Sequence, residues 1–346
     1  MRIAVDGRAL TGAWRFRGIA NYTKNIIRAL QELGFSPILY SWPCSEFDTN
    51  YELNFFGSKN YVVWENINLP IRLYKDSIDL VILPLNTGPV LYKSSKKVLV
   101  VHDLIAFNRD IKLTFQNLYK RWNLKLQKKN QIYLFVSETI KYDFSNQFHS
   151  RKNLNVLTNV FIPINQSDIA IKETENYIFS ISGTSETKNL NRLIESYLLY
   201  LKKGGNLNLY VLGVDLETQK KYKLINLGIK NKIKFINTGV SSAHLDNLYQ
   251  NSSLFIFIST QEGFGIPLLE ALQYNKPIVR SNIMIFNEIM GDLKYKCSPF
   301  NINEISDSII LAENEKYTLN DTDKSKIYEK YSFSNFKNKL NIILNG

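Results

Sequence analysis

Short apolar blocks recur along the chain and constrain its fold more than any other feature. Most are continuously apolar rather than alternating, which is typical of strands in a parallel sheet that is covered on both faces. Helical patterns lie between them, such as Gly18–Leu33, which ends at Gly34, and Leu190–Leu201. Strand and helix alternate once before about residue 160 and once after it, which predicts two doubly wound α/β domains. The blocks are Ile3–Val5, Leu80–Leu83, Val98–Val101, Ile132–Val136, Tyr177–Ile181, Leu207–Leu212, Ile233–Ile236, Leu254–Ile258 and Ile278–Val279.

The length of 346 residues also suits two domains rather than one core. The polar stretch Phe161–Glu175 contains Pro163 and shows little periodicity, so we place the boundary there. The predicted domains are residues 1–165 and 166–330. Residues 331–346 form a third segment, because Phe333–Leu344 has the pattern of an amphipathic helix.

Composition narrows the class of protein. A chain with 45% hydrophobic and 21% charged residues is able to build full globular cores. The two cysteines, Cys44 and Cys297, are far apart and lack metal-ligand spacing, so we expect two free thiols in a reducing compartment. No signal-peptide core follows Met1–Val5, and no apolar run reaches the roughly 18 residues that span a bilayer.

The formal net charge is +12, and basic residues outnumber acidic ones most clearly between Lys93 and Lys152. Such surfaces attract nucleic acid, anionic lipid or phosphorylated substrates, although a solvated basic face is an equally good interpretation. Within this region Lys112–Gln131 has the pattern of a helix. We expect its apolar side to pack on the N-terminal sheet while its basic face contacts anionic headgroups. Its apolar residues are Leu113, Phe115, Leu118, Trp122 and Leu126.

The stretch T-Q-E-G-F-G-I-P-L-L-E-A-L follows a strand block and predicts a glycine turn and a helix from Ile266 to about Tyr274. The helix-start amides near Gly265 and Ile266 suit phosphate oxygens, and the glycines let a ligand approach the backbone. Glu270 lies one turn inside the helix, within reach of hydroxyls attached to that phosphate, and Glu262 faces whatever lies beyond it. This order describes a nucleotide sugar; the alternative is an ordinary strand–turn–helix with two surface glutamates.

Three further positions are candidate site residues. Lys188 lies in the turn S-G-T-S-E-T-K-N-L before a helix, where a cation neutralises leaving-group charge. His102 ends a strand block beside Asp103, and open α/β sheets bind ligands at the carboxyl ends of their strands. Gly18 precedes a helix. A surface lysine, a structural histidine and an ordinary glycine at a helix start are the respective alternatives.

Several motifs together resemble one family. E-G-F-G-I-P-L-L-E resembles the Glu-x7-Glu signature of retaining glycosyltransferases of the GT-B fold, family 4. Five other stretches resemble motifs of the same family in the same order: M-R-I-A-V-D-G-R-A-L with R-G-I-A-N-Y-T-K-N-I-I-R-A-L, V-V-H-D-L, V-S-E-T, S-G-T-S-E-T-K-N-L and N-E-I-M-G-D. The resemblance implies two Rossmann-like domains facing across a cleft. The N-terminal domain is then the acceptor side, the C-terminal domain binds the nucleotide-sugar donor, and the final helix crosses back to the N-terminal domain.

The resemblance also implies roles for residues. Glu270 holds the nucleotide ribose, Glu262 and His102 contact the donor sugar, and Lys188 pairs with the diphosphate. Thr184 and Thr187 stand where many members have arginine, so another basic residue or the threonine hydroxyls take over. Donor-binding candidates besides Glu270 are Phe264, Gly265, Ile266, Gly18, Thr184 and Thr187. Acceptor-side candidates are Asp103, Arg15 and Arg17, and the arginines beside Gly18 are also candidates for the missing cation.

The implied reaction transfers a hexose or deoxyhexose, with retention and without a metal or cofactor, from GDP-mannose, a UDP-sugar or dTDP-rhamnose. The implied acceptor is a lipid-linked saccharide in bacterial O-antigen, capsule or exopolysaccharide synthesis. Asp321-Thr322-Asp323 matches the Asp-x-Asp motif of metal-dependent glycosyltransferases of another fold, but we predict an ordinary loop there. A cytoplasmic enzyme on the inner face of the plasma membrane, with no nucleic-acid partner, fits these features. Alternatives are an inactive GT-B sugar-binding scaffold, a basic nucleic-acid-binding protein, and a phosphorylase or synthase of the same fold.

Overall fold

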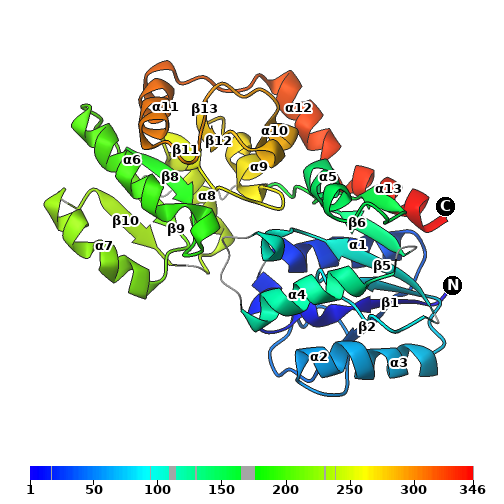
Figure 1. The fold of residues 1–346 in the computed structure, drawn as a ribbon. Coiled ribbons are helices and arrows are strands. Elements are labelled where there is room, and N and C mark those ends of the chain that lie inside the picture. Colours follow the sequence, from blue (N-terminus) through cyan, green and yellow to red (C-terminus); the bar gives the residue numbers. More distant parts are fainter. Residues whose placement is uncertain are drawn as a thin grey trace. The chain divides into compact units, whose positions relative to one another are not determined.

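The structure, a computed structural model, describes residues 1–16, 18–93, 95–108, 114–128, 131–164, 176–229, 231–237 and 239–345. It consists of two compact units: Met1–Val160 together with Tyr331–Gly346, and Phe161–Lys330. Each unit is built on one parallel sheet with helices packed against it (Figure 1). The second unit begins where the polar stretch of the sequence begins, and the acceptor and donor roles of the units stay predictions.

The first unit has a seven-stranded parallel sheet with the order β3-β2-β1-β4-β5-β6-β7. The strand order reverses beside β1, so the loops after β1 and β4 diverge and leave room for a ligand at that point. The strands are β1 Ile3–Asp6, β2 Ile38–Ser41, β3 Leu53–Phe55, β4 Leu80–Leu83, β5 Lys96–Val101, β6 Ile132–Phe135 and β7 Leu154–Val156. The helices are α1 Gly18–Glu32, α2 Tyr61–Val63, α3 Leu69–Lys75, α4 Phe115–Leu126, α5 Glu138–Gln147 and α13 Phe333–Asn345, with the short turns η1 Gly7–Leu10, η2 Gly12–Phe16, η3 Trp64–Asn68 and η4 Ile105–Phe107.

The two faces of this sheet are buried by different helices. Residues such as Val5 belong to a core with α1 and α13, while their neighbours such as Ala4 belong to a core with α3, α4 and α5. Burial on both faces is the physical reason for the continuously apolar strand sequences. The last helix is part of this unit: Phe336 of α13 packs edge to face on Tyr22 of α1, with 5.6 Å between ring centroids.

The second unit has a six-stranded parallel sheet with the order β10-β9-β8-β11-β12-β13, which reverses beside β8 in the same way. One core covers one face of it and includes residues of α6, α7 and α11. The strands are β8 Tyr177–Ile181, β9 Asn208–Leu212, β10 Ile233–Ile236, β11 Leu254–Phe257, β12 Ile278–Ser281 and β13 Lys296–Cys297. The helices are α6 Leu190–Lys202, α7 Leu216–Gly228, α8 Ser242–Asn251, α9 Ile266–Gln273, α10 Met284–Met290, α11 Ile302–Glu315 and α12 Asp321–Lys330, with the short turn η5 Glu186–Lys188.

All nine predicted strands are present, and the prediction missed β2, β3, β7 and β13, which are short. The predicted loop at Asp321–Asp323 was wrong, because these residues begin α12. Carboxylates in a first helical turn are stabilised by the positive end of the helix dipole. Both Asp side chains there also pair with lysines one turn later, Asp321 with Lys324 and Asp323 with Lys326.

The orientation of α4 also differs from the expectation. The apolar side predicted to pack on the sheet is largely exposed: Phe115 at 73%, Leu118 and Trp122 at 49% and Leu126 at 48%. The buried side carries Tyr119 and Asn123 instead, together with Leu124. Asn123 donates to the Gly88 carbonyl and accepts from the Gly88 amide, so the buried polar side chain satisfies the backbone of a loop after β4.

Both cysteines are free, as expected; Cys44 is half-buried and Cys297 is buried. In the part of the chain that the structure describes, no helix combines the length and the apolar character needed to cross a membrane.

Candidate functional site

The glycine turn after β11 leads directly into α9 in the second unit, which confirms the predicted strand–turn–helix. Gly265, the residue before α9, has φ of +144°, a backbone conformation that side chains disfavour. A Cβ at this position would also lie 3.0 Å from the ring of Phe286. The helix start at Ile266 therefore presents backbone, with the positive end of the helix dipole, rather than a capping side chain. Phe264, which is also a donor-binding candidate, is buried.

Glu270 lies one turn inside α9 and is half-buried. Its Oε2 accepts a hydrogen bond of 2.8 Å from the hydroxyl of Tyr249, a fully buried residue of α8. Burial raises the pKa of Glu270, and the Tyr249 hydrogen bond partly offsets this effect. The carboxylate is thus held in place by one phenol and keeps acceptor capacity for further hydroxyl groups.

Lys188 and Glu262, which are 74 positions apart in the sequence, form an ion pair in the second unit. The Lys188 Nζ lies 2.6 Å from Glu262 Oε1, with 30% and 15% of the two side chains exposed. Lys188 Nζ also lies 5.4 Å from the centroid of the Phe257 ring at the end of β11. Both groups follow strands that are neighbours in the sheet, β8 and β11, at the point where the strand order reverses. The sequence predicted a role for each residue but not their contact.

Two backbone features hold these turns together. The Thr260 amide donates to the Thr187 carbonyl at 2.8 Å, which ties the turn after β11 to the turn after β8. Asn189, in the left-handed conformation with φ of +61°, donates to the carbonyls of Ile258 and Pro299. Asn189 was not among the predicted site residues, although an asparagine at the start of a helix is a signal for such a conformation.

The two threonines that replace the family's arginines have local partners. Thr187 Oγ1 lies 3.1 Å from Ser185 Oγ, and Thr184 hydrogen-bonds the carboxylate of Asp215. Backbone and side-chain hydrogen bonds from Thr218 are the main cause that lowers the pKa of Asp215, and the hydrogen bond from Thr184 adds to it. Neither threonine supplies a charge to this turn.

His102 follows β5 in the first unit and is buried. Its amide donates to Asn86 Oδ1 at 2.6 Å, and its Nε2 lies 2.9 Å from the Pro84 carbonyl. A carbonyl only accepts, so Nε2 carries the proton in this contact and Nδ1 does not. Burial lowers the pKa of His102 to about 4; the charge of Asp103 opposes this and the charge of Lys120 adds to it. His102 is therefore neutral at neutral pH.

The remaining first-unit candidates differ in their contacts with the rest of the unit. Gly18 begins α1, and a Cβ on it would meet nothing within 4 Å, so packing does not require glycine there. Arg15 pairs with Glu46 at 2.8 Å and donates to the Gly12 carbonyl. Asp103 Oδ1 accepts from the Ile105 amide. Arg17 lies outside the described residues.

A fully buried charge cluster in the first unit was missed. Arg8, just after β1, binds Asp6 and Glu65 with Nη2 to oxygen distances of 2.6 Å each, and none of the three is exposed. Glu65 also accepts hydrogen bonds from the hydroxyls of Thr87 and Tyr119. Asp6-Gly7-Arg8 stands in the quoted first motif, but the second carboxylate comes from residue 65, and no local pattern connects it to Arg8.

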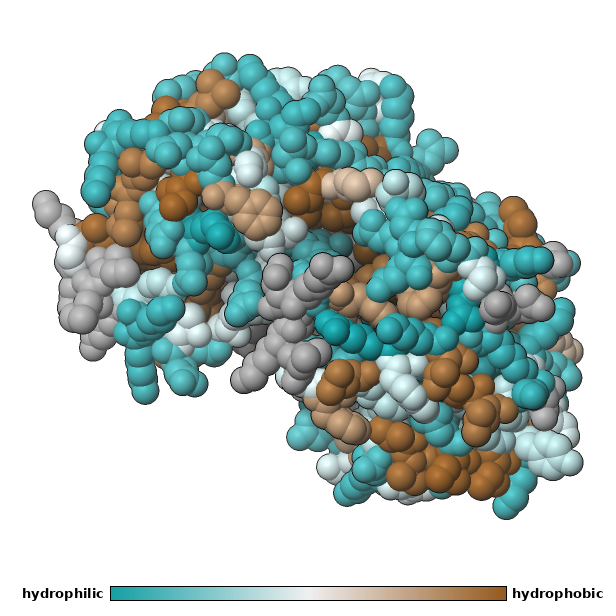
Figure 2. All heavy atoms as spheres, in the orientation of Figure 1, coloured by the Kyte–Doolittle hydropathy of each residue, from teal (hydrophilic) through white to brown (hydrophobic). Residues whose placement is uncertain are grey.

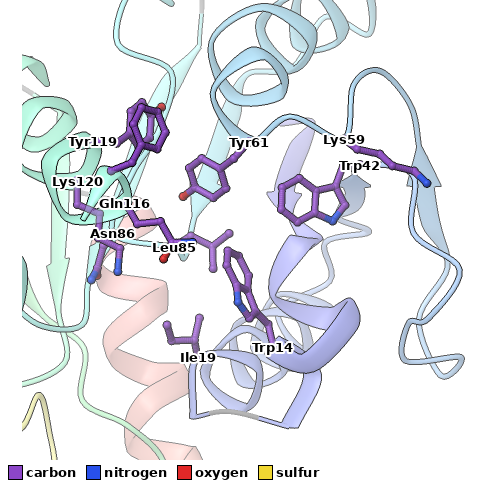
Figure 3. A pocket seen from close by; sticks show the side chains of 11 residues that line it. Trp14, Ile19, Trp42, Lys59, Tyr61, Leu85, Asn86, Gln116, Tyr119 and Lys120 are labelled. Carbon is purple, nitrogen blue, oxygen red and sulfur yellow. The ribbon is translucent and has the colours of Figure 1, made fainter. Parts of the chain in front are cut away.

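This cluster lies behind a cavity of about 460 Å³ in the first unit. Figure 3 shows its aromatic lining, with Trp14 and Trp42 opposite Tyr119 and with Tyr61 between them. Ile19, the neighbour of Gly18, and Asn86, the hydrogen-bond partner of the His102 amide, line it as well. The surroundings of the two first-unit candidates, Gly18 and His102, thus meet at one cavity.

In the described ranges no group of three or more His, Cys, Asp or Glu side chains is arranged to hold a metal ion. The expected independence from metals and cofactors stays a prediction.

Comparison with known proteins places these features in a family. The profile of the family described as Glycosyl transferases group 1 matches residues 161–331, about half of the chain. The O-antigen chain mannosyltransferase RfbU of Salmonella typhimurium is 28% identical over 197 residues, which cover 56% of this chain and 54% of RfbU. The chain thus spans about half the length of this curated relative.

Solved structures extend the likeness to the whole chain. The lipopolysaccharide outer core galactosyltransferase WaaB, in its apo form, is 17% identical with a TM-score of 0.73 over 99% of both chains. Anabaena Alr3699/HepE in complex with UDP and glucose is 15% identical with a TM-score of 0.74 over 100% of both chains. At this identity the likeness shows the fold, two parallel-sheet α/β units of the GT-B type. By its fold, its motifs and its family match, this chain belongs to the group 1 glycosyltransferases.

Proposed function

We propose that this chain is a retaining glycosyltransferase that moves a hexose or deoxyhexose from a nucleotide-diphosphate sugar to a saccharide hydroxyl. One observation carries the proposal: the Lys188–Glu262 pair stands at the carboxyl ends of β8 and β11, where the strand order of the second sheet reverses. Open α/β sheets bind nucleotide ligands at this point.

The donor lies on the second unit. The diphosphate takes the amides at Gly265 and Ile266 and the ammonium of Lys188, since a helix start and a cation both favour anions. The ribose hydroxyls donate to Glu270, which Tyr249 already orients at 2.8 Å. When Lys188 turns to the diphosphate, Glu262 is released to accept from the hydroxyls of the donor sugar. In the free protein, Lys188 and Glu262 thus bind each other in place of the diphosphate and the sugar hydroxyls.

Positioning and charge stabilisation account for the rate. The acceptor oxygen bonds to the anomeric carbon on the face that the diphosphate leaves, and the diphosphate departs with the electron pair of the broken bond. The acceptor proton passes to the departing diphosphate oxygen. Lys188 lowers the barrier because it is closest to charge that grows in the transition state. His102, neutral and fixed by the Pro84 carbonyl, does not act as a base at neutral pH, and contact with a sugar hydroxyl is the role that we propose for it.

GDP-mannose is the first donor to test, because the relative RfbU is an O-antigen chain mannosyltransferase. The name of this relative favours a role in O-antigen synthesis. An acceptor on a lipid carrier is part of the proposal. The enzyme is then cytoplasmic and attaches to the inner face of the plasma membrane.

The outward face of α4 supports attachment to a membrane. Phe115, Leu118, Trp122 and Leu126 are spaced three or four residues apart and are about half exposed or more. Figure 2 shows hydrophobic residues gathered on this side of the first unit, over α2, α3 and α4. Lys125 on the same helix adds positive charge, and a helix with these properties lies in the headgroup region of anionic bilayers.

Cosedimentation with phosphatidylglycerol vesicles tests this attachment. Trp122→Ser should weaken vesicle binding about tenfold, because the indole loses its place in the apolar boundary. Ile342→Ser on α13 is the control, since Ile342 is 71% exposed but lies on another helix. Equal binding of wild type and Trp122→Ser would exclude α4 as the contact.

A thermal-shift panel of GDP-mannose, UDP-glucose, UDP-galactose and dTDP-rhamnose tests the donor site. We expect one of these donors to stabilise wild type and Glu195→Ala but not Glu270→Ala; Glu195 is an exposed glutamate of α6 in the same unit. A donor that binds all three proteins equally would contradict the ribose role of Glu270. Donor binding without transfer to any membrane-lipid acceptor would favour an inactive scaffold, for which Thr184 and Thr187 are the supporting observation.

A further inference from the structure

The cavity of the first unit has the size and lining of a small-molecule site. Its volume of about 460 Å³ lies within the range of about 300–1,000 Å³ that such sites occupy. Five of its lining residues are aromatic, and the rings of four of them, Trp14, Trp42, Tyr61 and Tyr119, form a continuous surface. The Tyr61 ring lies 6.2 Å from Trp14, 5.9 Å from Trp42 and 5.5 Å from Tyr119, measured between centroids.

These rings are held from behind by the buried charge cluster. The Tyr61 hydroxyl bonds to Thr87 Oγ1 at 2.5 Å, and Thr87 in turn donates to Glu65 at 2.8 Å. The Tyr119 hydroxyl donates to the other oxygen of Glu65 at 2.6 Å. The Arg8 guanidinium carbon lies 4.4 Å from the centroid of Tyr61. Two walls of the cavity therefore have fixed orientations before any ligand arrives, which lowers the entropy cost of binding.

Two lysines, Lys59 and Lys120, line the same cavity. Lys120 of α4 is half-buried, and within the described ranges no carboxylate lies at ion-pair distance from its Nζ. None of the described lining residues is acidic. Figure 3 shows Lys120 beside Asn86 at one end of the cavity, whereas Lys59 at the other end extends away from the remaining side chains. A partly desolvated ammonium without a partner favours an anionic ligand.

We propose that this cavity binds a pyranose ring that carries a negatively charged substituent, with the ring on the aromatic walls and the anion on Lys120. The C–H face of a pyranose is apolar and packs on an aromatic face, while its rim of hydroxyls reaches polar groups such as Asn86 and Gln116. Resting on the proposed function, this ligand is the acceptor saccharide. Its anion is a phosphate, as on a sugar attached through phosphate to a carrier, or the carboxylate of an acidic sugar.

Calorimetric titration of the 346-residue chain with four probes tests the proposal. The probes are N-acetylglucosamine 1-phosphate, methyl glucuronide, the neutral methyl N-acetylglucosaminide and inorganic phosphate. We expect at least one anionic sugar to bind about tenfold or more tightly than the neutral glycoside, and more tightly than inorganic phosphate, which lacks a ring. The preferred anion identifies the source: phosphate indicates a carrier-linked acceptor and carboxylate an acidic sugar.

Two variants separate the ring from the charge. Lys120→Gln should abolish the preference for anionic sugars and leave the neutral glycoside unchanged, and Trp14→Ala should weaken every sugar. Lys75→Gln, an exposed lysine at the end of α3, is the matched control and should bind like wild type. Equal affinity for neutral and anionic sugars, an unchanged preference in Lys120→Gln, or inorganic phosphate binding as tightly as the sugar phosphate would each overturn the proposal.

Failure here is distinguishable from failure of the proposed function. Suppose that a nucleotide sugar binds through Glu270 and is transferred, but Lys120→Gln leaves the acceptor KM unchanged. The transferase then stands, and the cavity is not its acceptor site. Suppose instead that no nucleotide sugar binds while acidic sugars bind through Lys120. The cavity is then a sugar-binding site on a protein without transferase activity.

Discussion

The two units carry ion pairs of opposite character. In the first unit Arg8 lies between Asp6 and Glu65, and all three side chains have no exposed surface. In the second unit Lys188 and Glu262 are 30% and 15% exposed. The first cluster is closed: removing one member leaves a buried charge or donor without its partner. The second pair is open, so either member can exchange its partner for a ligand. Burial thus distinguishes the Arg8 cluster, which fixes the structure around it, from the Lys188–Glu262 pair, which is accessible to a ligand.

Replacing Glu65 by Gln should have the largest effect and should act on stability. Glu65 accepts from Arg8, Thr87, Tyr119 and Asn123, and an amide turns an NH2 group toward some of these donors. Urea unfolding should show a loss of about 3–5 kcal/mol. Glu46→Gln is the control: its partner Arg15 is only partly buried, so we expect a loss of less than about 1 kcal/mol. Equal losses in the two variants would break the distinction between closed and open pairs.

Replacing Lys188 by Ala should lower activity strongly and change stability little. The pair with Glu262 is partly exposed, so stability should change by less than about 1 kcal/mol. The rate of transfer should fall about 10²–10³-fold in kcat, because the leaving diphosphate loses its cation. Steady-state kinetics with the donor found in the thermal-shift panel, together with urea unfolding, measures both quantities. A fall in stability as large as that of Glu65→Gln would mean that Lys188 holds the fold and not the ligand.

The buried His102 gives a stability change with pH. Its pKa of about 4 lies below the value of an exposed histidine, so the unfolded chain binds a proton here that the folded chain does not. This contribution is fully present above about pH 6.5 and is lost as the pH falls toward 4, up to about 3 kcal/mol. His102→Gln should flatten the difference in unfolding free energy between pH values of about 7 and 4.5, while His149→Gln, at an exposed position, should not. The same slope in wild type and His102→Gln would contradict it.

Titration of Glu270 should produce the smallest effect. Its contribution to stability should change with pH in the opposite direction to that of His102. Burial raises its pKa, so the folded chain binds this proton more readily than the unfolded chain, and stability falls as the pH rises through that range. Donor binding needs the ionised carboxylate as acceptor, so donor affinity should fall about tenfold as the pH is lowered through the raised pKa. Titrations of the donor across acidic to neutral pH should show this fall in wild type and not in Glu270→Gln.

Sequence reasoning succeeded best where the chemistry is contiguous. Leu254–Leu272 contains the strand β11, the glycine turn and the start of α9, and each depends on its own residues. The strand depends on its continuously apolar side chains, the turn on the positive φ of Gly265 and the helix start on the missing N–H of Pro267. The same reasoning failed for α4. Its apolar spacing predicted a buried side, but Tyr119 and Asn123 occupy the core because they satisfy Glu65 and the backbone of Gly88, partners that lie 54 and 35 positions away.

The sequence by itself thus determined two doubly wound sheets, the turns at their strand ends and the family, because continuous strands and glycine turns depend on interactions between neighbouring residues. The tertiary structure decided which charges are paired and what lines the cavity of the first unit. Trp14, Tyr61, Asn86 and Lys120 come from four different elements or loops and meet only because parallel strands bring their carboxyl ends to one edge of the sheet. Burial, which no single stretch of sequence encodes, then separates the closed charge cluster from the open pair.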